Sequence, residues 1–185
     1  MTALPKSKML VEDFLEWAEA QPDGKYELID GVPVAMSPER IRHSEAKGES
    51  FAAFRSAILT AKLPCRVWVD GPSVRIGKHR TRVPDIVVQC GERNADSLLA
   101  ENPVIVAEVI SPSSKRLDSS DKLDEYFAVP SIQHYLIVKP DKRVVVHHAR
   151  RAGGDILTRI FTTGLIELAP PGLSVNCEDL LGPAN

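Results

Sequence analysis

The chain has 185 residues, of which 43% are hydrophobic and 26% are charged, a composition typical of a globular protein. Its formal net charge of −2 excludes a protein whose whole surface is tuned to bind nucleic acid, but it is compatible with a local basic patch. We expect one domain over residues 1–185, because a chain of this length buries enough surface to fold without a disulfide or a structural metal.

The cysteines and the apolar runs indicate the compartment. Cys65, Cys90 and Cys177 form no CxxC or CxxH pair, so we expect neither a disulfide framework nor a zinc knuckle. The N-terminus lacks the apolar core of a signal peptide, and no run reaches the ~20 apolar residues of a membrane span. These features predict a soluble cytoplasmic protein with no membrane partner.

Hydrophobic periodicity predicts two helices and several strands in the first half of the chain. Helical spacing of apolar residues marks two amphipathic segments, the second of which ends before Pro64. Runs of strand-forming residues are separated by turn residues, among them Asp30-Gly31 in a short hairpin. The expected elements are, in order, a helix over 10–20, hairpin strands over 25–29 and 32–36, a helix over 43–61, and strands over 65–70, 72–77 and 82–90.

The second half predicts one further helix within a series of strands. Residues 103–111 form the most apolar run and have the pattern of a central strand. Capping oxygens and apolar residues at offsets of three and four predict a helix within residues 111–127. Strands are then expected over 133–138, 143–149 and 156–161, before a Pro/Gly-rich tail. Two or three helices and about eight strands indicate an α+β domain with a mixed sheet.

Two carboxylates interrupt segments that otherwise have the composition of buried strands. Asp85 lies in the segment RVPDIVVQC, and Glu108 lies in the segment PVIVAEVIS. Because alternate residues of a strand share a face, Glu108 continues the apolar face of Val106 and is expected at the rim of a pocket. An unpaired carboxylate in a dry interior costs several kcal/mol, so each must reach solvent, pair with a cation or bind a metal.

The spacing of these acids is compatible with a metal site. Asp85 and Glu108 are 23 residues apart, which is enough for two neighbouring strands to bring them side by side. Two adjacent carboxylates suit a hard cation such as Mg²⁺ or Mn²⁺, which can activate water and neutralise a phosphate oxygen. Lys122 follows on the next helix and is the candidate to orient or deprotonate that water.

Each of these residues also has a simpler interpretation. Asp85 follows a proline and could be a turn residue, and Glu108 could pair with a basic side chain across the sheet. Lys122 shares a helix face with Asp118 and Tyr126, and it could be a solvated lysine paired with Asp118. His147 and His148 point to opposite sides of one strand, which is poor metal geometry, so we expect both to be structural.

An ordered set of motifs resembles a known family. The segments YELIDGVPVAM, VPDIVV, VAEVISPSS, DKLDEY and VPSIQHYLIV, together with His43 and Asp118, resemble the Uma-type family of putative restriction endonucleases within the PD-(D/E)xK nuclease superfamily. The resemblance covers residues 10–168. It implies a restriction-endonuclease-like fold, in which helices flank a central mixed β-sheet and the metal site lies at one end of that sheet.

The resemblance also implies roles for single residues. Asp85 and Glu108 match the two acidic motif positions. The usual lysine lies two positions after the second acid, where this chain has Ile110, and Lys122 is then the displaced lysine. Related nucleases further imply that the backbone carbonyl of Val109 faces the metal.

Two more residues match motif positions of the family and are expected to complete the pocket. Glu27, in YELIDG, is implied to act in catalysis, in a second-shell or second-metal role, and His43 is implied to support the site. The simpler interpretations are a solvent-facing ion pair for Glu27 and a helix cap for His43.

Basic residues bracket the acidic ones along the chain, on the loop before Asp85 and on the segment after Glu108. They are candidates for contacts with substrate phosphates, although the first cluster could equally be a solvated hairpin tip. The candidates are Lys78, Arg80, Arg82, Lys115 and Arg116.

These features favour a hydrolase: an Mg²⁺- or Mn²⁺-dependent endonuclease that cleaves phosphodiester bonds in nucleic acid, with DNA favoured as the partner. A homodimer is compatible with this function. One alternative is a non-catalytic nucleic-acid-binding or protein-interaction module that retains the fold, because fold does not fix function. Another is a metal-free protein whose carboxylates form ion pairs with Lys122 and an arginine.

Overall fold

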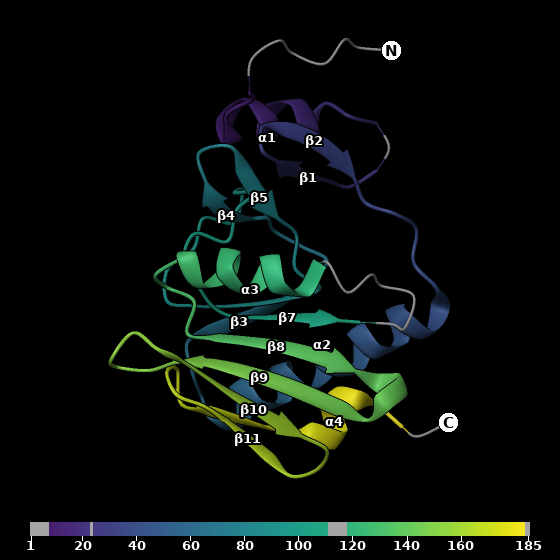
Figure 1. Ribbon diagram of the computed structural model, residues 1–185, viewed down its shortest axis with the longest axis vertical. Coiled ribbons are helices and arrows are strands. Elements are labelled where there is room, and N and C mark those ends of the chain that lie inside the picture. Colours follow the sequence, from purple (N-terminus) through teal and green to yellow (C-terminus); the bar gives the residue numbers. More distant parts are fainter. Residues whose placement is uncertain (1–7, 23, 111–117, 184–185) are drawn as a thin grey trace.

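The computed structural model of the protein describes residues 8–22, 24–110 and 118–183. Its centre is a six-stranded sheet with the order β10-β9-β8-β7-β6-β3 (Figure 1). Strands β7 and β8 run parallel and the other neighbours run antiparallel, so the predicted mixed sheet is confirmed. The strands are β3 (Cys65–Val69), β6 (Ile86–Cys90), β7 (Pro103–Val109), β8 (His134–Lys139), β9 (Val144–Arg150) and β10 (Ile156–Phe161).

Helices cover both faces of this sheet. On one face, α2 contacts β3, β6 and β7, and α4 contacts β8 and β9. On the other face lies α3, whose Tyr126 packs against Tyr135 of β8 (Figure 1). The covering elements are α2 (Ile41–Thr60), α3 (Asp118–Ala128), α4 (Cys177–Leu181) and the hairpin of β11 (Leu165–Leu168) with β12 (Leu173–Asn176); a 3-10 helix, η1 (Pro140–Lys142), joins β8 to β9.

A second, smaller sheet lies beyond α3, so that α3 separates the two sheets (Figure 1). Its strand order is β2-β1-β5-β4, and α1 packs Val11 and Phe14 against Leu28 of β1. The elements of this layer are α1 (Val11–Glu19), β1 (Tyr26–Ile29), β2 (Val32–Ala35), β4 (Val74–Gly77) and β5 (Arg80–Arg82). The predicted hairpin at Asp30-Gly31 is therefore confirmed as β1–β2.

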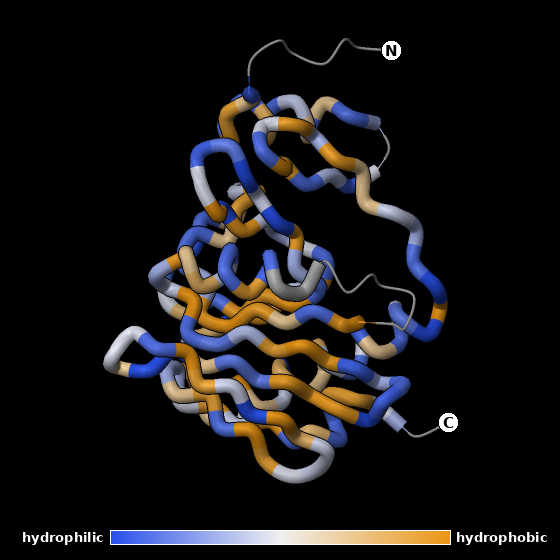
Figure 2. The backbone as a smooth tube through the Cα atoms, viewed as in Figure 1, coloured by the Kyte–Doolittle hydropathy of each residue, from blue (hydrophilic) through white to orange (hydrophobic). Residues whose placement is uncertain are grey.

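The alternation expected along β7 is present. Ile105, Ala107 and Val109 join the core beneath α2 and α4, whereas Val106 joins the core beneath α3. Figure 2 shows the resulting concentration of hydrophobic residues along the central strands and the hydrophilic turns at their ends. Glu108 consequently points toward α3 from an otherwise apolar strand.

The single strand predicted over residues 82–90 is wrong. The segment contains the end of β5 in the small sheet and all of β6 in the central sheet. Pro84 has no backbone N–H and cannot continue a ladder, so the chain leaves one sheet there and enters the other. Asp85 therefore lies at the crossing between the two sheets, immediately before β6.

Other element predictions need smaller corrections. The second helix begins at Ile41, so His43 lies inside its first turn rather than at its start. The Pro/Gly-rich tail, for which no strand was predicted, contains the hairpin β11–β12 before α4. The hairpin was missed because its strands have only four residues each, too few to show a period.

The expectation of no disulfide is also wrong. Cys65 and Cys90 form a disulfide, and Cys177 is a buried thiol. The two half-cystines are direct partners in the antiparallel register of β3 and β6. A sequence separation of 25 carries no recognisable motif, because the pairing depends on how the strands align.

None of the helices within the described ranges is long and apolar enough to cross a membrane.

The histidines of β8 and β9 are buried structural groups, as expected for His147 and His148. His134 Nε2 lies 2.8 Å from the carbonyl oxygen of Pro170, which can only accept, so this nitrogen carries the proton. The Nε2–H of His147 then donates to Nδ1 of His134 at 2.9 Å. Burial lowers the pKa of His134, and it lowers the pKa of His147 to about 4.

This pair predicts a loss of stability in mild acid. The unfolded chain protonates these histidines near pH ~6.5, whereas the folded protein keeps His147 neutral down to about 4, so the unfolded state binds more protons between these values. The free energy of unfolding of the wild type should therefore fall by about 1–2 kcal/mol more than that of His147→Gln between pH ~7 and pH ~5. Urea unfolding of both proteins measures the difference. His134 bonds His147 directly, so the difference between the two proteins measures the pair, and equal losses would contradict the assignment.

Candidate metal centre

The site is arranged around the carboxylate of Asp85, which is only 6% exposed. Its Oδ2 accepts a hydrogen bond from the backbone N–H of Val109 at 2.7 Å, which joins the start of β6 to the end of β7. Lys47 Nζ lies 2.8 Å from Oδ1, and His43 Nε2 lies 3.4 Å from Oδ2. Three groups from two elements, α2 and β7, therefore hold this one carboxylate.

The first turns of α2 supply the two cationic groups. His43 and Lys47 are four residues apart, so they lie one above the other on the helix face that meets β6. Glu39, just before the helix, brings its carboxylate close to His43 and Asp85: ligand atoms of these three residues all lie within 4.8 Å of one another. The group is therefore a possible metal site.

Lys47 is the functional candidate that the sequence interpretation missed. It is 1% exposed, and its ammonium pairs with Glu39 and with Asp70 Oδ1 at 2.5 Å as well as with Asp85. Asp70 follows β3, where its backbone N–H donates to the carbonyl oxygen of Asp85 at 3.0 Å. A signal existed in the sequence, because Lys47 lies on the same helix face as Phe54 and thus interrupts an apolar stripe.

Glu108 forms the other half of the site. It is 7% exposed and faces α3, where Lys122 Nζ lies 3.1 Å from its Oε1 and the Tyr126 hydroxyl donates to the same oxygen at 2.5 Å. Lys122 and Tyr126 do share a helix face, as their spacing indicated, and both point at Glu108. The side chain of Asp118 lies outside the described side chains.

The pKa values of the two carboxyl groups are displaced in opposite directions. Burial raises the pKa of Glu108 to about 7, and the charge of Asp85 adds to this against the opposing charge of Lys122. For Asp85, burial alone would raise the pKa, but the hydrogen bond from His43 and the charge of Lys47 lower it below its ordinary value. One acid is thus held ionised while its neighbour titrates near neutrality, a pattern common at catalytic sites.

Glu27 lies in an ion-pair network next to the site. Its Oε1 accepts from the backbone N–H of Val83 at 2.9 Å, and its Oε2 pairs with Arg82 at 2.9 Å. Arg82 also bonds Glu125 of α3 at 2.6 Å, and Arg80 pairs with the same carboxylate. The expected solvent-facing ion pair of Glu27 is therefore a half-buried one that links β1, β5 and α3.

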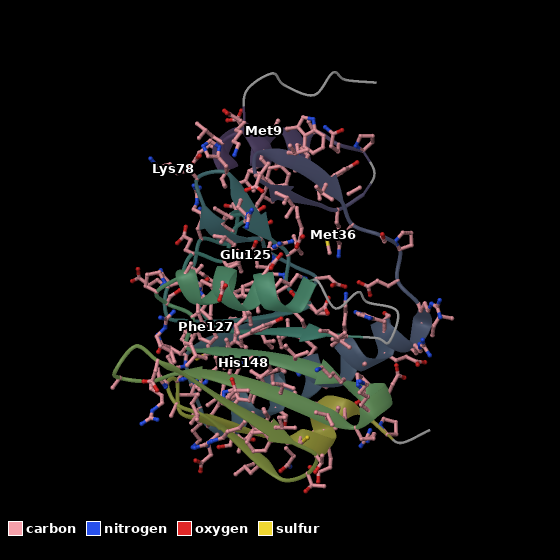
Figure 3. The ribbon with its side chains drawn as sticks, viewed as in Figure 1. Met9, Met36, Lys78, Glu125, Phe127 and His148 are labelled. Atoms are coloured by element: carbon pink, nitrogen blue, oxygen red, sulfur yellow. A yellow bond between two sulfur atoms is a disulfide. The ribbon has the colours of Figure 1, made fainter. Side chains whose placement is uncertain are left out.

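The proposed phosphate-binding residues that the structure describes have other contacts than Asp85. Arg80 and Arg82 pair with carboxylates, and Lys78 lies at the β4–β5 turn close to Met9, on the far side of the small sheet from α3 (Figure 3). Lys115 and Arg116 lie outside the described residues. The N–H of Val109 binds Asp85, and the proposed role of its carbonyl stays a prediction.

A cavity of about 590 Å³ opens beside His43, between α2, the end of β7 and the C-terminal segment. Ile110 lines it at the position where the superfamily has a lysine, so the wall there is apolar. Arg42 and Arg143 also line this cavity. Lys122 reaches Glu108 from α3, on the face of the sheet where Ile110 also packs, so its role as the displaced lysine stays a prediction.

The fold is a mixed sheet flanked by helices, with one buried acid at the end of β7 and another immediately before its neighbour β6. The family model Uma2, described as "Putative restriction endonuclease", matches residues 11–179, so the chain belongs to this family. The predicted resemblance is therefore confirmed, and membership indicates a nuclease-type hydrolase.

The chain is also similar to two individual proteins. A protein of Synechocystis sp., described as "Uncharacterized protein slr1290", is 27% identical over 182 residues, covering 92% of this chain and 90% of the relative. The crystal structure of "a putative nuclease belonging to DUF820" from Anabaena variabilis superposes with a TM-score of 0.70 at 18% identity, covering 94% of this chain and 97% of that one. The latter likeness shows the fold, and it confirms the predicted fold class.

The contact between His43 and Asp85 predicts a measurable shift. The hydrogen bond to Asp85 is the main reason that the pKa of His43 lies above its ordinary value, and burial opposes it. We expect Asp85→Asn to lower the pKa of His43. NMR titration of the imidazole resonances measures this pKa in both proteins. His148, on β9, serves as the internal reference and should titrate alike in both proteins. An unchanged pKa of His43 would contradict the geometry of the site.

Proposed function

We propose that the protein is a nuclease that hydrolyses phosphodiester bonds in nucleic acid, most simply DNA, with the help of Mg²⁺ or Mn²⁺. The observation that carries this proposal is the pair of buried carboxylates on neighbouring strands, Asp85 and Glu108, with their pKa values displaced in opposite directions. Family membership supports the hydrolase class.

The donor set fits a hard divalent cation. Carboxylate oxygens are preferred by Mg²⁺ and Mn²⁺, and a histidine nitrogen is acceptable to Mn²⁺. We propose that Asp85 and Glu108 hold the ion with the Val109 carbonyl, and that Glu39 and His43 complete its surroundings. Such an ion supplies an activated water and neutralises charge on the phosphate.

Lys122 is the residue that we propose to orient the attacking water. Its ammonium lies 3.1 Å from Glu108, and its side chain is 14% exposed, so it can meet both the carboxylate and solvent. The Tyr126 hydroxyl fixes the same carboxylate oxygen from the interior. These two contacts restrict Glu108 to one orientation, with Lys122 at the edge that solvent reaches.

Glu27 acts, in this proposal, on the backbone rather than on the substrate. Its carboxylate accepts the N–H of Val83, two residues before Asp85, and its other oxygen is held by Arg82. The segment that carries Asp85 from one sheet to the other is thereby fixed. Glu27 would then support catalysis by positioning Asp85.

A second candidate function has one observation in its favour. Asp85 is already satisfied by Lys47, His43 and the N–H of Val109, as a metal-free, non-catalytic module would require. This module predicts no Mn²⁺ site shared by Asp85 and Glu108. Measuring Mn²⁺ binding therefore separates the two functions.

Activity should depend on both carboxylates. We expect Asp85→Asn and Glu108→Gln each to lower Mg²⁺- or Mn²⁺-dependent cleavage of plasmid DNA and of single-stranded RNA on the order of 100-fold or more, because each removes a charge that the ion needs. The matched control is Glu101→Gln, an exposed glutamate just before β7, which should cleave as the wild type does. Wild-type activity in both site variants would contradict the assignment, as would an inactive wild type.

Cation binding should strengthen as the pH rises. Glu108, with a pKa of about 7, is mostly protonated near pH ~6 and mostly ionised near pH ~8, and only the ionised form attracts Mn²⁺. We expect Mn²⁺ to raise the unfolding temperature more at pH ~8 than at pH ~6. Glu108→Gln should remove most of this Mn²⁺ effect at both pH values. Equal stabilisation of wild type and variant would show that Glu108 does not bind the ion.

A further inference from the structure

Lys47 is surrounded by carboxylates from three parts of the chain. Its ammonium contacts Asp85 before β6, Asp70 after β3 and Glu39 before α2. An ammonium has three protons, so each of these carboxylates can accept one of them. With 1% exposure and its three donors directed at these acids, Lys47 has no access to substrate or to a reacting water.

The charge of this lysine is permanent. Burial alone would lower the pKa of Lys47, but the three carboxylates raise it well above its ordinary value. Because its three protons are directed at three carboxylates, Lys47 is placed as a cation and not as a general base. What it supplies is one fixed positive charge at the centre of three negative ones.

The two carboxylate oxygens of Asp85 have different partners. Oδ1 faces Lys47 at 2.8 Å, whereas Oδ2 lies beside His43 and the N–H of Val109. In hydrolases with two metal ions, a clamp of two cations about 3.5–4 Å apart is held by shared ligands. In this protein Asp85 corresponds to the shared ligand, and the position beside its Oδ1 is occupied by the ammonium of Lys47.

We propose that Lys47 takes the place of a second divalent cation, so that the centre binds one divalent ion, on the Oδ2 side of Asp85. This inference rests on the proposed function for the identity of that ion. Lys47 is then a positioning residue: it neutralises Asp70 and Glu39, fixes Oδ1 of Asp85 and leaves the other oxygen for the ion.

The physical consequence is that removing the ammonium vacates a cation site. Without Lys47, the carboxylates of Glu39, Asp70 and Asp85 repel one another, and a divalent cation can relieve that repulsion. An ordinary structural ion pair makes no such prediction. Its loss would lower stability without changing the number of ions that the folded protein binds.

Calorimetric titration with Mn²⁺ counts the ions. The wild type should bind one Mn²⁺ and Lys47→Met should bind one more, with a larger rise in unfolding temperature on Mn²⁺ addition. Adding Asp70→Asn to Lys47→Met should weaken the extra site by about 10-fold or more, which places it among these carboxylates. Lys62→Met, an exposed lysine at the other end of α2, is the control and should bind as the wild type does.

Several outcomes would overturn the inference: a wild type that binds two ions, a wild type that binds none, or a folded Lys47→Met that gains none. If Lys47→Met folds only with Mn²⁺ present, that result supports it. If it does not fold at all, Lys47→Gln takes its place in the titration, and a folded Lys47→Gln that gains no ion overturns the inference. A wild type that binds one ion but cleaves neither DNA nor RNA contradicts the proposed function alone.

Discussion

The neutralisation of one buried carboxylate, Asp85, is the constraint on which the rest of the centre depends. A buried charge without partners would cost several kcal/mol, and the chain meets this requirement with Lys47, His43 and the Val109 N–H, drawn from α2 and β7. Each partner adds a structural link. As a result, the end of the central sheet, the start of α2 and the crossing from the small sheet converge at one point.

A second network fixes the helix that carries Lys122. Glu125 of α3 (Figure 3) binds Arg82 and Arg80 of β5. Arg82 in turn binds Glu27 of β1. The small sheet is thereby joined to α3, and Lys122 and Tyr126 are held over Glu108. Arg80 and Arg82, which the sequence suggested for phosphate contacts, have carboxylate partners in this network, and their contact with phosphate stays a prediction.

Much of this architecture could be predicted from the sequence, because strand alternation and helical spacing are local properties. They put Glu108 on the same face of its strand as Val106, and Lys122 and Tyr126 on one helix face. What failed depends on contacts between distant segments: the Cys65–Cys90 pairing follows from strand register, and the break at Pro84 follows from a change of sheet. Lys47 was missed because an isolated lysine in an amphipathic helix is normally solvated, and its partners lie in three separate segments.

The central claim is that Asp85 and Glu108 hold a divalent cation, with Lys47 as its permanent neighbour. The most direct measurement is anomalous scattering from crystals of the protein grown with Mn²⁺. The account predicts a single peak within about 2–2.5 Å of Asp85 Oδ2 and of a Glu108 oxygen, with the Lys47 ammonium still on Oδ1. No peak at these carboxylates, or an ion in the position of the Lys47 ammonium, would contradict it.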